Sequence, residues 1–250
     1  MAIVLIGIDD TDNQDSPGTG KLARRLDGEA AQRGAVPLGI TRHQFLQDAR
    51  IPFTTHNSGA CIAIEWAKPV ADLKFAMDLI QEWAAEGSDP GVCIALADAV
   101  PPAVSDWGWR ATREVLTMDE ARAVAKANGM WLRDLGGTGQ GIIGALGSVG
   151  LRADGNHGRY LDLPGLRDVG EFVSREELSL MGIQIEHQEP MHVGAANTSR
   201  TSAAGTAGAY KTMGWIRPRL TNGKPVWVVE WSEEQHAWIP VDRKRSRPLE

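Results

Sequence analysis

The chain has 250 residues, of which 42% are hydrophobic and 23% are charged, and its formal net charge is -6. These values are ordinary for soluble globular proteins and exclude a collagen, a coiled coil and a wholly disordered chain. The apolar run over residues 2–8 is far shorter than the ~20 residues of a membrane span. No basic stretch precedes it, as one would in a signal peptide. We therefore expect a cytoplasmic protein with no membrane partner.

Cys61 and Cys93 both lie in apolar, strand-like runs and lack the spacing of metal ligands. We expect them to be small buried residues of a reducing compartment. The acidic balance of the chain argues against a broad electrostatic contact with nucleic acid, although a local basic patch is compatible with it.

Strands and helices alternate in the first part of the chain. Residues 2–8 form a β-branched apolar run, and the apolar residues of 20–33 recur at helical spacing. Further strands and helices are predicted over 36–41, 59–66, 69–83, 92–96 and behind a capping box of Thr117 and Glu120. The alternation predicts an α/β or α+β fold with a mixed sheet and flanking helices.

The composition changes near residue 194. Residues 194–208 consist almost wholly of small and polar residues, which is a linker composition. Three strand-like runs follow, and the tripeptide at 221–223 predicts a tight turn between the first two. We expect an α/β region over 1–190, a linker or loop over 191–210, and a small Trp-rich β unit with a basic tail over 211–250.

Three carboxylates, Asp9, Asp10 and Asp12, follow the first predicted strand. Like charges this close repel one another, and a divalent cation with oxygen ligands relieves the repulsion. Mg²⁺ is the natural candidate, because it binds through one or two carboxylates together with water and substrate phosphates. The alternative is a solvated turn in which Asp9 or Asp12 caps the next helix.

The segment after the acidic residues superficially resembles the end of a phosphate loop. The P-loop pattern fails, because Asp15 replaces its first glycine and Leu22 replaces its Ser or Thr. Small residues still let a phosphate approach a helix N-terminus, and Thr19 supplies a hydroxyl near the carboxylates. An ordinary helix start is the alternative. The candidate phosphate-binding residues of this segment are Gly18, Gly20 and Lys21.

Two further segments have residues suited to anions. The glycines of 136–141 allow backbone amides to converge on an anion, with a flexible hinge as the rival interpretation. Arginine binds phosphate through two parallel hydrogen bonds, which suggests Arg42 and Arg50. His56 is a candidate for the same anion or for proton transfer, and an exposed turn residue is the alternative.

Three segments, in order, resemble the tRNA-Ile 2-agmatinylcytidine synthetase family, archaeal enzymes that join agmatine to a wobble cytidine using ATP. Residues 7–12 read Gly-Ile-Asp-Asp-Thr-Asp, as the family does at the same place. Residues 51–53 with 57–60 resemble its Ile-Pro-Tyr and Gly-Asn-Gly-Ala segments. Residues 141–146 resemble its Gly-Leu-Ile-Gly-Ala-Leu segment. The resemblance covers roughly residues 3–152.

The resemblance implies a kinase-like domain that binds ATP and Mg²⁺ and activates a cytidine carbonyl by phosphoryl transfer, within a ligase-type tRNA modification. It implies metal and phosphate roles for Asp9, Asp10 and Asp12. A threonine that the family phosphorylates falls on Thr19. The nucleotide-phosphate contacts that it implies fall on Asn57, Gly59, Gly139, Gln140, Gly141 and Gly144.

The chain also departs from the family. Family members carry an OB-type tRNA-binding domain and a zinc ribbon, and two isolated cysteines cannot make a ribbon. The basic run before the family's glycine loop is replaced by residues 134–138. We therefore expect an ATP- and Mg²⁺-dependent phosphotransferase-like enzyme that acts on a small metabolite or a nucleobase.

Two alternatives remain open. One is a nucleotide-binding or regulatory module without turnover. The other is an RNA- or DNA-binding protein in which tryptophans of the C-terminal unit stack bases and nearby arginines meet phosphates, although such tryptophans also suit a core. The residues concerned are Trp215, Trp227, Trp231, Trp238, Arg217, Arg219 and the run 243–247.

Overall fold

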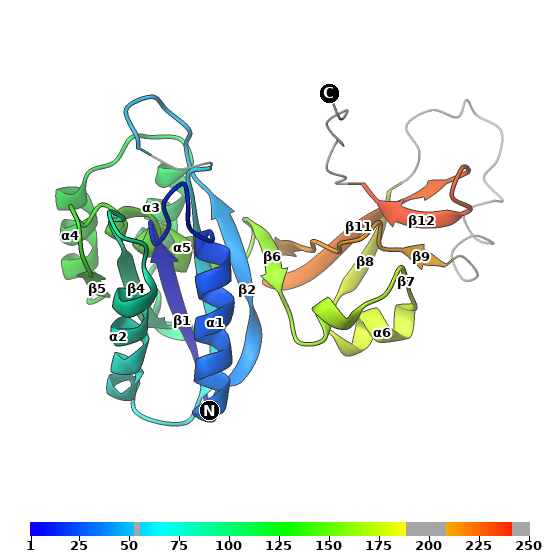
Figure 1. The fold of residues 1–250 in the computed structure, drawn as a ribbon, viewed down its shortest axis with the longest axis horizontal. Coiled ribbons are helices and arrows are strands. Elements are labelled where there is room, and N and C mark those ends of the chain that lie inside the picture. The colour runs from blue at the N-terminus through cyan, green and yellow to red at the C-terminus, as the bar shows by residue number, and fades with distance from the viewer. Residues whose placement is uncertain (53–55, 189–208, 242–250) are drawn as a thin grey trace. The chain divides into compact units, whose positions relative to one another are not determined.

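The structure is a computed structural model that describes residues 1–52, 56–188 and 209–241 (Figure 1). Most of the predicted linker, the basic run 243–247 and Phe53 lie outside the described residues. The chain divides into two compact units. Unit 1 is Met1–Pro164 with Leu220–Gly223, and unit 2 is Gly165–Arg219 with Lys224–Glu250. The domain limits expected at 190 and 210 stay predictions.

A sheet with the strand order β5-β4-β1-β3-β2-β6 forms the centre of unit 1. Its strands are β1 (Ala2–Asp9), β2 (Val36–Gln44), β3 (Ser58–Trp66), β4 (Gly91–Leu96), β5 (Trp131–Asp134) and β6 (Arg159–Asp162). Neighbours along this order are antiparallel. β1 lies in the middle, which explains its continuous apolar run. The mixed α/β class predicted from the sequence is confirmed.

Helices cover both faces of this sheet. They are α1 (Thr19–Gln32), α2 (Lys74–Trp83), α3 (Pro102–Ala111), α4 (Met118–Ala127) and α5 (Ile142–Asp154), with short 3₁₀ turns at Val70–Leu73 and Ala97–Ala99. α1 and α2 pack on one face, and α3, α4 and α5 on the other (Figure 1). α4 begins with the predicted capping box, in which the Thr117 side chain accepts from the Glu120 amide.

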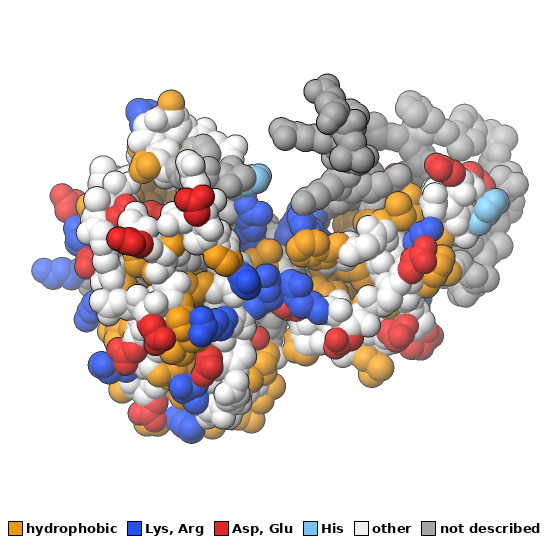
Figure 2. Space-filling view, viewed as in Figure 1, with side chains coloured by type: hydrophobic (Ala, Val, Ile, Leu, Met, Phe, Trp, Pro, Cys, Tyr) orange, Lys and Arg blue, Asp and Glu red, His pale blue; other side chains and the backbone are white. Residues whose placement is uncertain are grey.

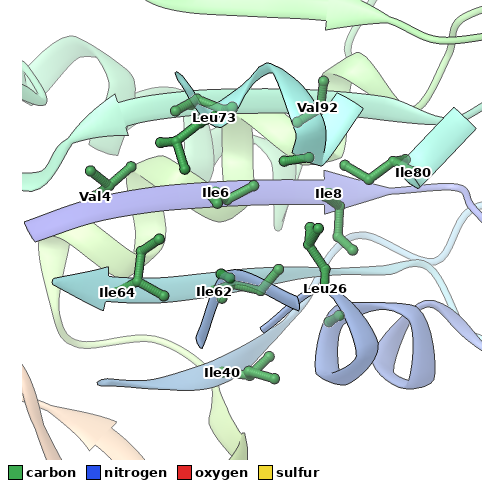
Figure 3. Close-up of a cluster of buried hydrophobic side chains, with 14 of the residues drawn as sticks. Val4, Ile6, Ile8, Leu26, Ile40, Ile62, Ile64, Leu73, Ile80 and Val92 are labelled. Atoms are coloured by element: carbon green, nitrogen blue, oxygen red, sulfur yellow. The ribbon is translucent and has the colours of Figure 1, made fainter. Parts of the chain in front are cut away.

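Strand alternation separates two cores. Figure 3 shows Ile6 of β1 among the apolar side chains of neighbouring strands, with Leu26 contributed by α1. Leu5, Cys61 and Cys93 belong to the opposite core, against α3 and α5. Both cysteines are free and fully buried, as predicted.

α5 packs closely against β1 because a glycine faces it. A Cβ atom on Gly7 would overlap the carbonyl oxygen of Ala145 in the helix. A larger residue at position 7 would therefore push α5 away from the sheet. The close packing brings the N-terminal turn of α5 to the carboxyl end of β1.

Over its described residues, unit 2 is a small unit of strands with one short α-helix. Its elements are β7 (Phe172–Val173), α6 (Arg175–Leu180), β8 (Gln184–Gln188), β9 (Tyr210–Lys211), β11 (Lys224–Ser232) and β12 (Ala237–Pro240), with a 3₁₀ turn at Leu166–Asp168. β10 (Arg219–Thr221) is shorter than the strand expected over 215–220 and spans the unit boundary. Trp227 and Trp238 are buried, whereas Trp215 is 44% exposed.

One face of unit 1 mixes both signs of charge. Figure 2 shows acidic and basic side chains interspersed on the face turned to the viewer. That face therefore lacks the broad basic character of a nucleic-acid-binding surface. No helix within the described ranges combines the length and the apolar composition that a bilayer crossing requires.

Asp27 of α1 is a group whose ionisation we expect to destabilise unit 1. Its Oδ1 atom is buried and has no hydrogen-bond partner within the described residues. Burial, and then the charge of Asp162, raise its pKa from 3.8 to about 6. The folded state thus holds the proton more tightly than the unfolded state. Stability is therefore lost as pH rises from about 4 through about 6.

We expect Asp27→Asn to stabilise the protein by about 1–2 kcal/mol near pH 8 and to change stability little near pH 4, after allowance for solvent screening. Urea denaturation at both pH values measures this difference. Asp106→Asn, at an exposed position of α3, is the control and should change stability little at either pH. A gain for Asp27→Asn that is equal at both pH values would contradict the assignment.

Candidate functional site

The three acidic residues that follow β1 line one pocket, which we call the first pocket. It encloses about 810 Å³ of space, open solvent included. Its lining residues are Asp9, Asp10, Asp12, Phe45, Arg50, Ile51, Pro52, His56, Asn57, Ser58, Ala111, Glu114, Val115, Leu116, Gln140, Ile143 and Gly144. Segments that are distant in the sequence therefore meet beyond the carboxyl end of β1.

The first pocket has a polar side and an apolar side. The carboxylates of β1 and the polar residues of 56–58 form the polar side. The apolar side comes from Phe45, Ile51 and Pro52, from Ile143 and from the connection between α3 and α4, including Val115 and Leu116. Val115, Leu116 and Ile143 could not be predicted as pocket residues from the sequence, because such apolar residues have the same pattern as core residues. The pocket suits a ligand with one flat apolar part and one charged part.

Asp9 is held against the first turn of α5. A Cβ atom on Gly144 would overlap the Asp9 carboxylate, so the glycine provides the space that this carboxylate occupies. Asp9 Oδ1 accepts a hydrogen bond of 2.9 Å from the Asp10 amide. Burial, which outweighs this hydrogen bond, raises the pKa of Asp9 to about 7, and the charges of Asp10 and Asp12 add to the rise. The ionised form of Asp9 is therefore unfavourable in this structure, and a bound cation would stabilise it.

Asp10 has a strained backbone. Its φ angle is +53°, a region that residues other than glycine adopt rarely and at a cost of about 1 kcal/mol or more. Burial, followed by the charges of Asp89 and Asp12, raises the pKa of its side chain to about 6. Strain and an unfavourable charge on the same residue are typical of a functional site.

Asp12 and Thr19 form a hydrogen-bonded pair at the start of α1. Thr19 Oγ1 donates to Asp12 Oδ1 at 2.7 Å, and the Thr19 amide donates to the same atom at 3.3 Å. Thr11 Oγ1 donates to Thr19 Oγ1 at 3.1 Å. Both threonines are buried. The Thr19 hydroxyl, which was predicted to lie near the acidic residues, is thus in direct contact with Asp12.

A second pocket adjoins the first. It encloses about 520 Å³, open solvent included, and it shares Asp12, His56 and Ser58 with the first pocket. Its other lining residues are Thr19, Gly20, Arg42, Gly59, Ala60 and Leu161. The structure therefore divides the predicted phosphate-binding residues between two pockets, with Asp12 in the wall of both.

Arg50 and Asn57 line the first pocket, and part of each polar group is already hydrogen-bonded to the protein. Arg50 is exposed and binds Asp48 through two hydrogen bonds of 2.8 Å. Asn57 Nδ2 donates to the carbonyl of Leu46 at 2.6 Å. The side chain of Asn57 therefore stabilises the backbone near Leu46. Arg50 would have to break its hydrogen bonds with Asp48 before the same atoms could bind a ligand.

Four of the predicted residues line neither pocket, namely Gly18, Lys21, Gly139 and Gly141. Lys21 is exposed on α1. The Gly141 amide donates to the carbonyl of Asp89 at 2.9 Å, and the Gly139 amide to that of Gly136 at 3.2 Å. In this structure the glycine segment thus forms a turn that positions Gln140 and Gly144, with these two amides bonded to the protein.

Within the described residues, no three His, Cys, Asp or Glu side chains are grouped so that they alone would hold a metal ion. The three carboxylates of the first pocket are therefore not a closed metal cage. Oxygen ligands from a bound substrate would have to complete a metal site there.

The comparisons with known proteins confirm the resemblance over the first part of the chain. No protein-family model matches the chain. It is 31% identical over 151 residues to the tRNA-Ile 2-agmatinylcytidine synthetase TiaS of Pyrococcus horikoshii, which covers 58% of this chain and 35% of the relative. The chain thus spans about a third of the length of this curated relative.

Two solved structures are also similar. They are TiaS in a complex with its isoleucine tRNA and ATP, and a tRNA fluorescent labeling enzyme, each at 29% identity. Their TM-scores are 0.52 and 0.51, and they cover 60% and 59% of this chain and 36% of each of those chains. This chain therefore contains a TiaS-like domain.

Proposed function

We propose that the protein binds ATP with Mg²⁺ in the first pocket and transfers the γ-phosphoryl group of ATP to a small metabolite or a nucleobase. One observation carries this proposal: the three carboxylates that follow β1 line the same pocket as a group of apolar side chains. The similarity to TiaS, solved in a complex with ATP and tRNA, supports it.

The residues of the first pocket fit a magnesium ion. Asp9, Asp10 and Asp12 offer hard oxygen ligands, which Mg²⁺ prefers. Gly144 leaves room for the Asp9 carboxylate at the pocket edge, and the raised pKa values of Asp9 and Asp10 are those of carboxylates that a cation would stabilise. One or two of these carboxylates would hold the ion together with oxygens of the ATP phosphates, and the ion would supply charge neutralisation there.

The two sides of the pocket suggest how the nucleotide is oriented. The apolar side, with Phe45, Leu116 and Ile143, would pack against the adenine ring, which leaves the phosphates at the carboxylates. His56 would add a hydrogen bond beside the phosphates, and Arg50 would add positive charge there after releasing Asp48. Phosphoryl transfer depends mainly on such positioning and electrostatic stabilisation.

The similarity to TiaS also suggests what the phosphoryl transfer would accomplish. Activation of a nucleobase carbonyl by phosphorylation would make the reaction a ligase-type step of RNA modification, as the resemblance implies. Thr19 is a further candidate acceptor, because its hydroxyl lies beside Asp12. Its oxygen would bond to the γ-phosphorus as the bond from that phosphorus to ADP breaks, and the hydroxyl proton would pass to Asp12.

The test is turnover of radiolabelled ATP by the full chain with Mg²⁺ and with EDTA, with mass spectrometry across Thr19. We expect Mg²⁺-dependent release or transfer of phosphate, lowered about 100-fold or more by Asp10→Asn. Asp15→Asn is the matched control, because Asp15 belongs to the same loop and lines neither pocket. It should stay within about twofold of the wild type.

Two results would contradict the proposal. Tight binding of ATP without turnover would indicate a nucleotide-binding module. Absence of ATP binding in a folded wild-type protein would mean that the TiaS-like domain retains the fold without this activity.

A further inference from the structure

We infer that Asp89 is a positioning residue of the first pocket, because it joins the acidic segment after β1 to the turn over residues 136–141, which we call the glycine turn. The inference deepens the proposed function and rests on it, since both segments contribute residues to the pocket assigned to ATP. Asp89 lies just before β4 and lines neither pocket itself. It would therefore act on a ligand through its neighbours.

The backbone amide of Asp89 holds the acidic segment. It donates a hydrogen bond to the carboxylate of Asp10, which lines the first pocket. Just before Asp89, the amide of Ala85 donates to the carbonyl of Thr11 at 3.0 Å. The φ angle of Asp10 is +53°, so these contacts from another segment help to hold a conformation that is unfavourable by itself. The direction of the Asp10 carboxylate thus depends on where Asp89 lies.

The side chain and the carbonyl of Asp89 hold the glycine turn. Its Oδ1 atom accepts a hydrogen bond from the Thr138 amide, and its carbonyl accepts one of 2.9 Å from the Gly141 amide. Gly137 lies against the same carboxylate, because a Cβ atom there would overlap Oδ1. Its φ angle of +60° also favours glycine. A hydrogen bond from an amide to a carboxylate is charge-assisted, so this side chain is a strong link to the turn.

The glycine turn ends at the first pocket. Gln140 lines the pocket, and α5 begins at Ile142. A Cβ atom on Gly141 would lie 2.7 Å from the carbonyl oxygen of Asp9, so the turn packs directly on the end of β1. A nucleotide that reaches both the carboxylates and Gln140 needs the two segments at a fixed spacing. Asp89 sets that spacing, because it is hydrogen-bonded to both segments.

Asparagine at position 89 separates positioning from charge. Its side-chain oxygen accepts the same hydrogen bond from the Thr138 amide but carries no charge. If Asp89 acts by geometry, Asp89→Asn keeps most of the ligand binding and Asp89→Ala loses it. If the charge of Asp89 attracted the cation directly, both changes would weaken binding equally.

The test is calorimetric titration of the full chain with a non-hydrolysable ATP analogue over a series of Mg²⁺ concentrations. The measured quantity is the Mg²⁺ concentration that gives half-maximal analogue binding, because a loss of folding stability alone does not move it in protein that is still folded. The variants are Asp89→Ala, Asp89→Asn, Gly137→Ala and the double variant with alanine at both positions. The controls are Asp98→Ala, at an exposed position after β4, and Gly129→Ala, where φ is +65° and a Cβ atom has no neighbour within 4 Å.

We expect Asp89→Ala and Gly137→Ala each to raise this Mg²⁺ concentration about tenfold, since each breaks the charge-assisted hydrogen bond to the glycine turn. Asp89→Asn should raise it at most about threefold, and both controls should stay within about twofold of the wild type. The double variant should be at most about threefold worse than either single variant, because both changes break one contact.

Hydrogen–deuterium exchange of the ligand-free protein is the second measurement. Asp89→Ala should speed amide exchange over residues 136–141 and also over residues 10–13, because Asp89 joins the two segments. This measurement tests the link without any nucleotide.

Four results would overturn the inference: a wild-type Mg²⁺ requirement in Asp89→Ala, an Asp89→Asn protein as impaired as Asp89→Ala, single effects that multiply in the double variant, or faster exchange confined to the glycine turn. Failure of the proposed function appears separately, as absence of Mg²⁺-dependent analogue binding in the wild type.

Discussion

Replacement of Gly144 by alanine is expected to abolish nucleotide binding in the first pocket. The added methyl group would overlap the Asp9 carboxylate and lie 2.9 Å from Cε2 of Phe45. Either Asp9 leaves its position or the first turn of α5 moves away from the sheet. We expect affinity for a Mg²⁺–ATP analogue to fall about 100-fold or more, and stability to fall by about 1–3 kcal/mol from overpacking.

Calorimetry with the analogue and urea denaturation measure the two effects. Gly28→Ala is the matched control, because it makes the same change in α1, where a Cβ atom would have no neighbour within 4 Å. It should leave affinity unchanged and raise stability by about 0.5–1 kcal/mol, since alanine is the better helix former. A Gly144→Ala protein with wild-type affinity would show that the Asp9 position is irrelevant to binding.

Replacement of Asp9 by asparagine is expected to abolish turnover while making the protein more stable above neutral pH. Asparagine has nearly the same shape, so it can still accept the hydrogen bond from the Asp10 amide. It removes the charge that a bound Mg²⁺ would need, and we expect turnover to fall about 100-fold or more. It also removes a carboxylate whose ionisation is unfavourable in the folded state.

The dependence on pH has a definite sign. The pKa of Asp9 is about 7 in the folded protein and 3.8 without the fold, so the folded state binds the proton more tightly. Stability from this group is lost as pH rises from about 4 to about 7. Asp9→Asn should therefore gain about 1–3 kcal/mol near pH 8 and little near pH 4. In the wild type, Mg²⁺ affinity should fall as pH falls from about 8 to about 6, because binding requires the ionised carboxylates of Asp9 and Asp10.

Urea denaturation at the two pH values, together with Mg²⁺ titration of wild type and Asp9→Asn, measures these effects. Asp15→Asn serves again as control, with stability and turnover expected to follow the wild type. An Asp9→Asn protein that is less stable near pH 8 and keeps its turnover would mean that Asp9 has a structural role only.

Local patterns in the sequence determined several of the helices and strands and the position of the acidic residues at the end of β1. The apolar run before Asp9, the helical spacing from residue 20 and the capping box at Thr117 each depend on neighbours a few residues away. The burial of Cys61 and Cys93 also followed from their local runs. The resemblance to the synthetase family rests on short ordered segments and is confirmed by the relatives.

The tertiary structure alone decided which candidates meet. Arg42 lines the second pocket, while its neighbour His43 is fully buried, with its Nε2 2.8 Å from Thr41 Oγ1, because successive side chains of a strand point to opposite faces. Gly139 and Gly141 shape a turn, and Gly144 makes room for Asp9. Part of the apolar side of the first pocket comes from the connection between α3 and α4, which no motif marked. These outcomes depend on distances between segments far apart in the chain, and such distances are set by how α5 and its neighbours pack on the sheet.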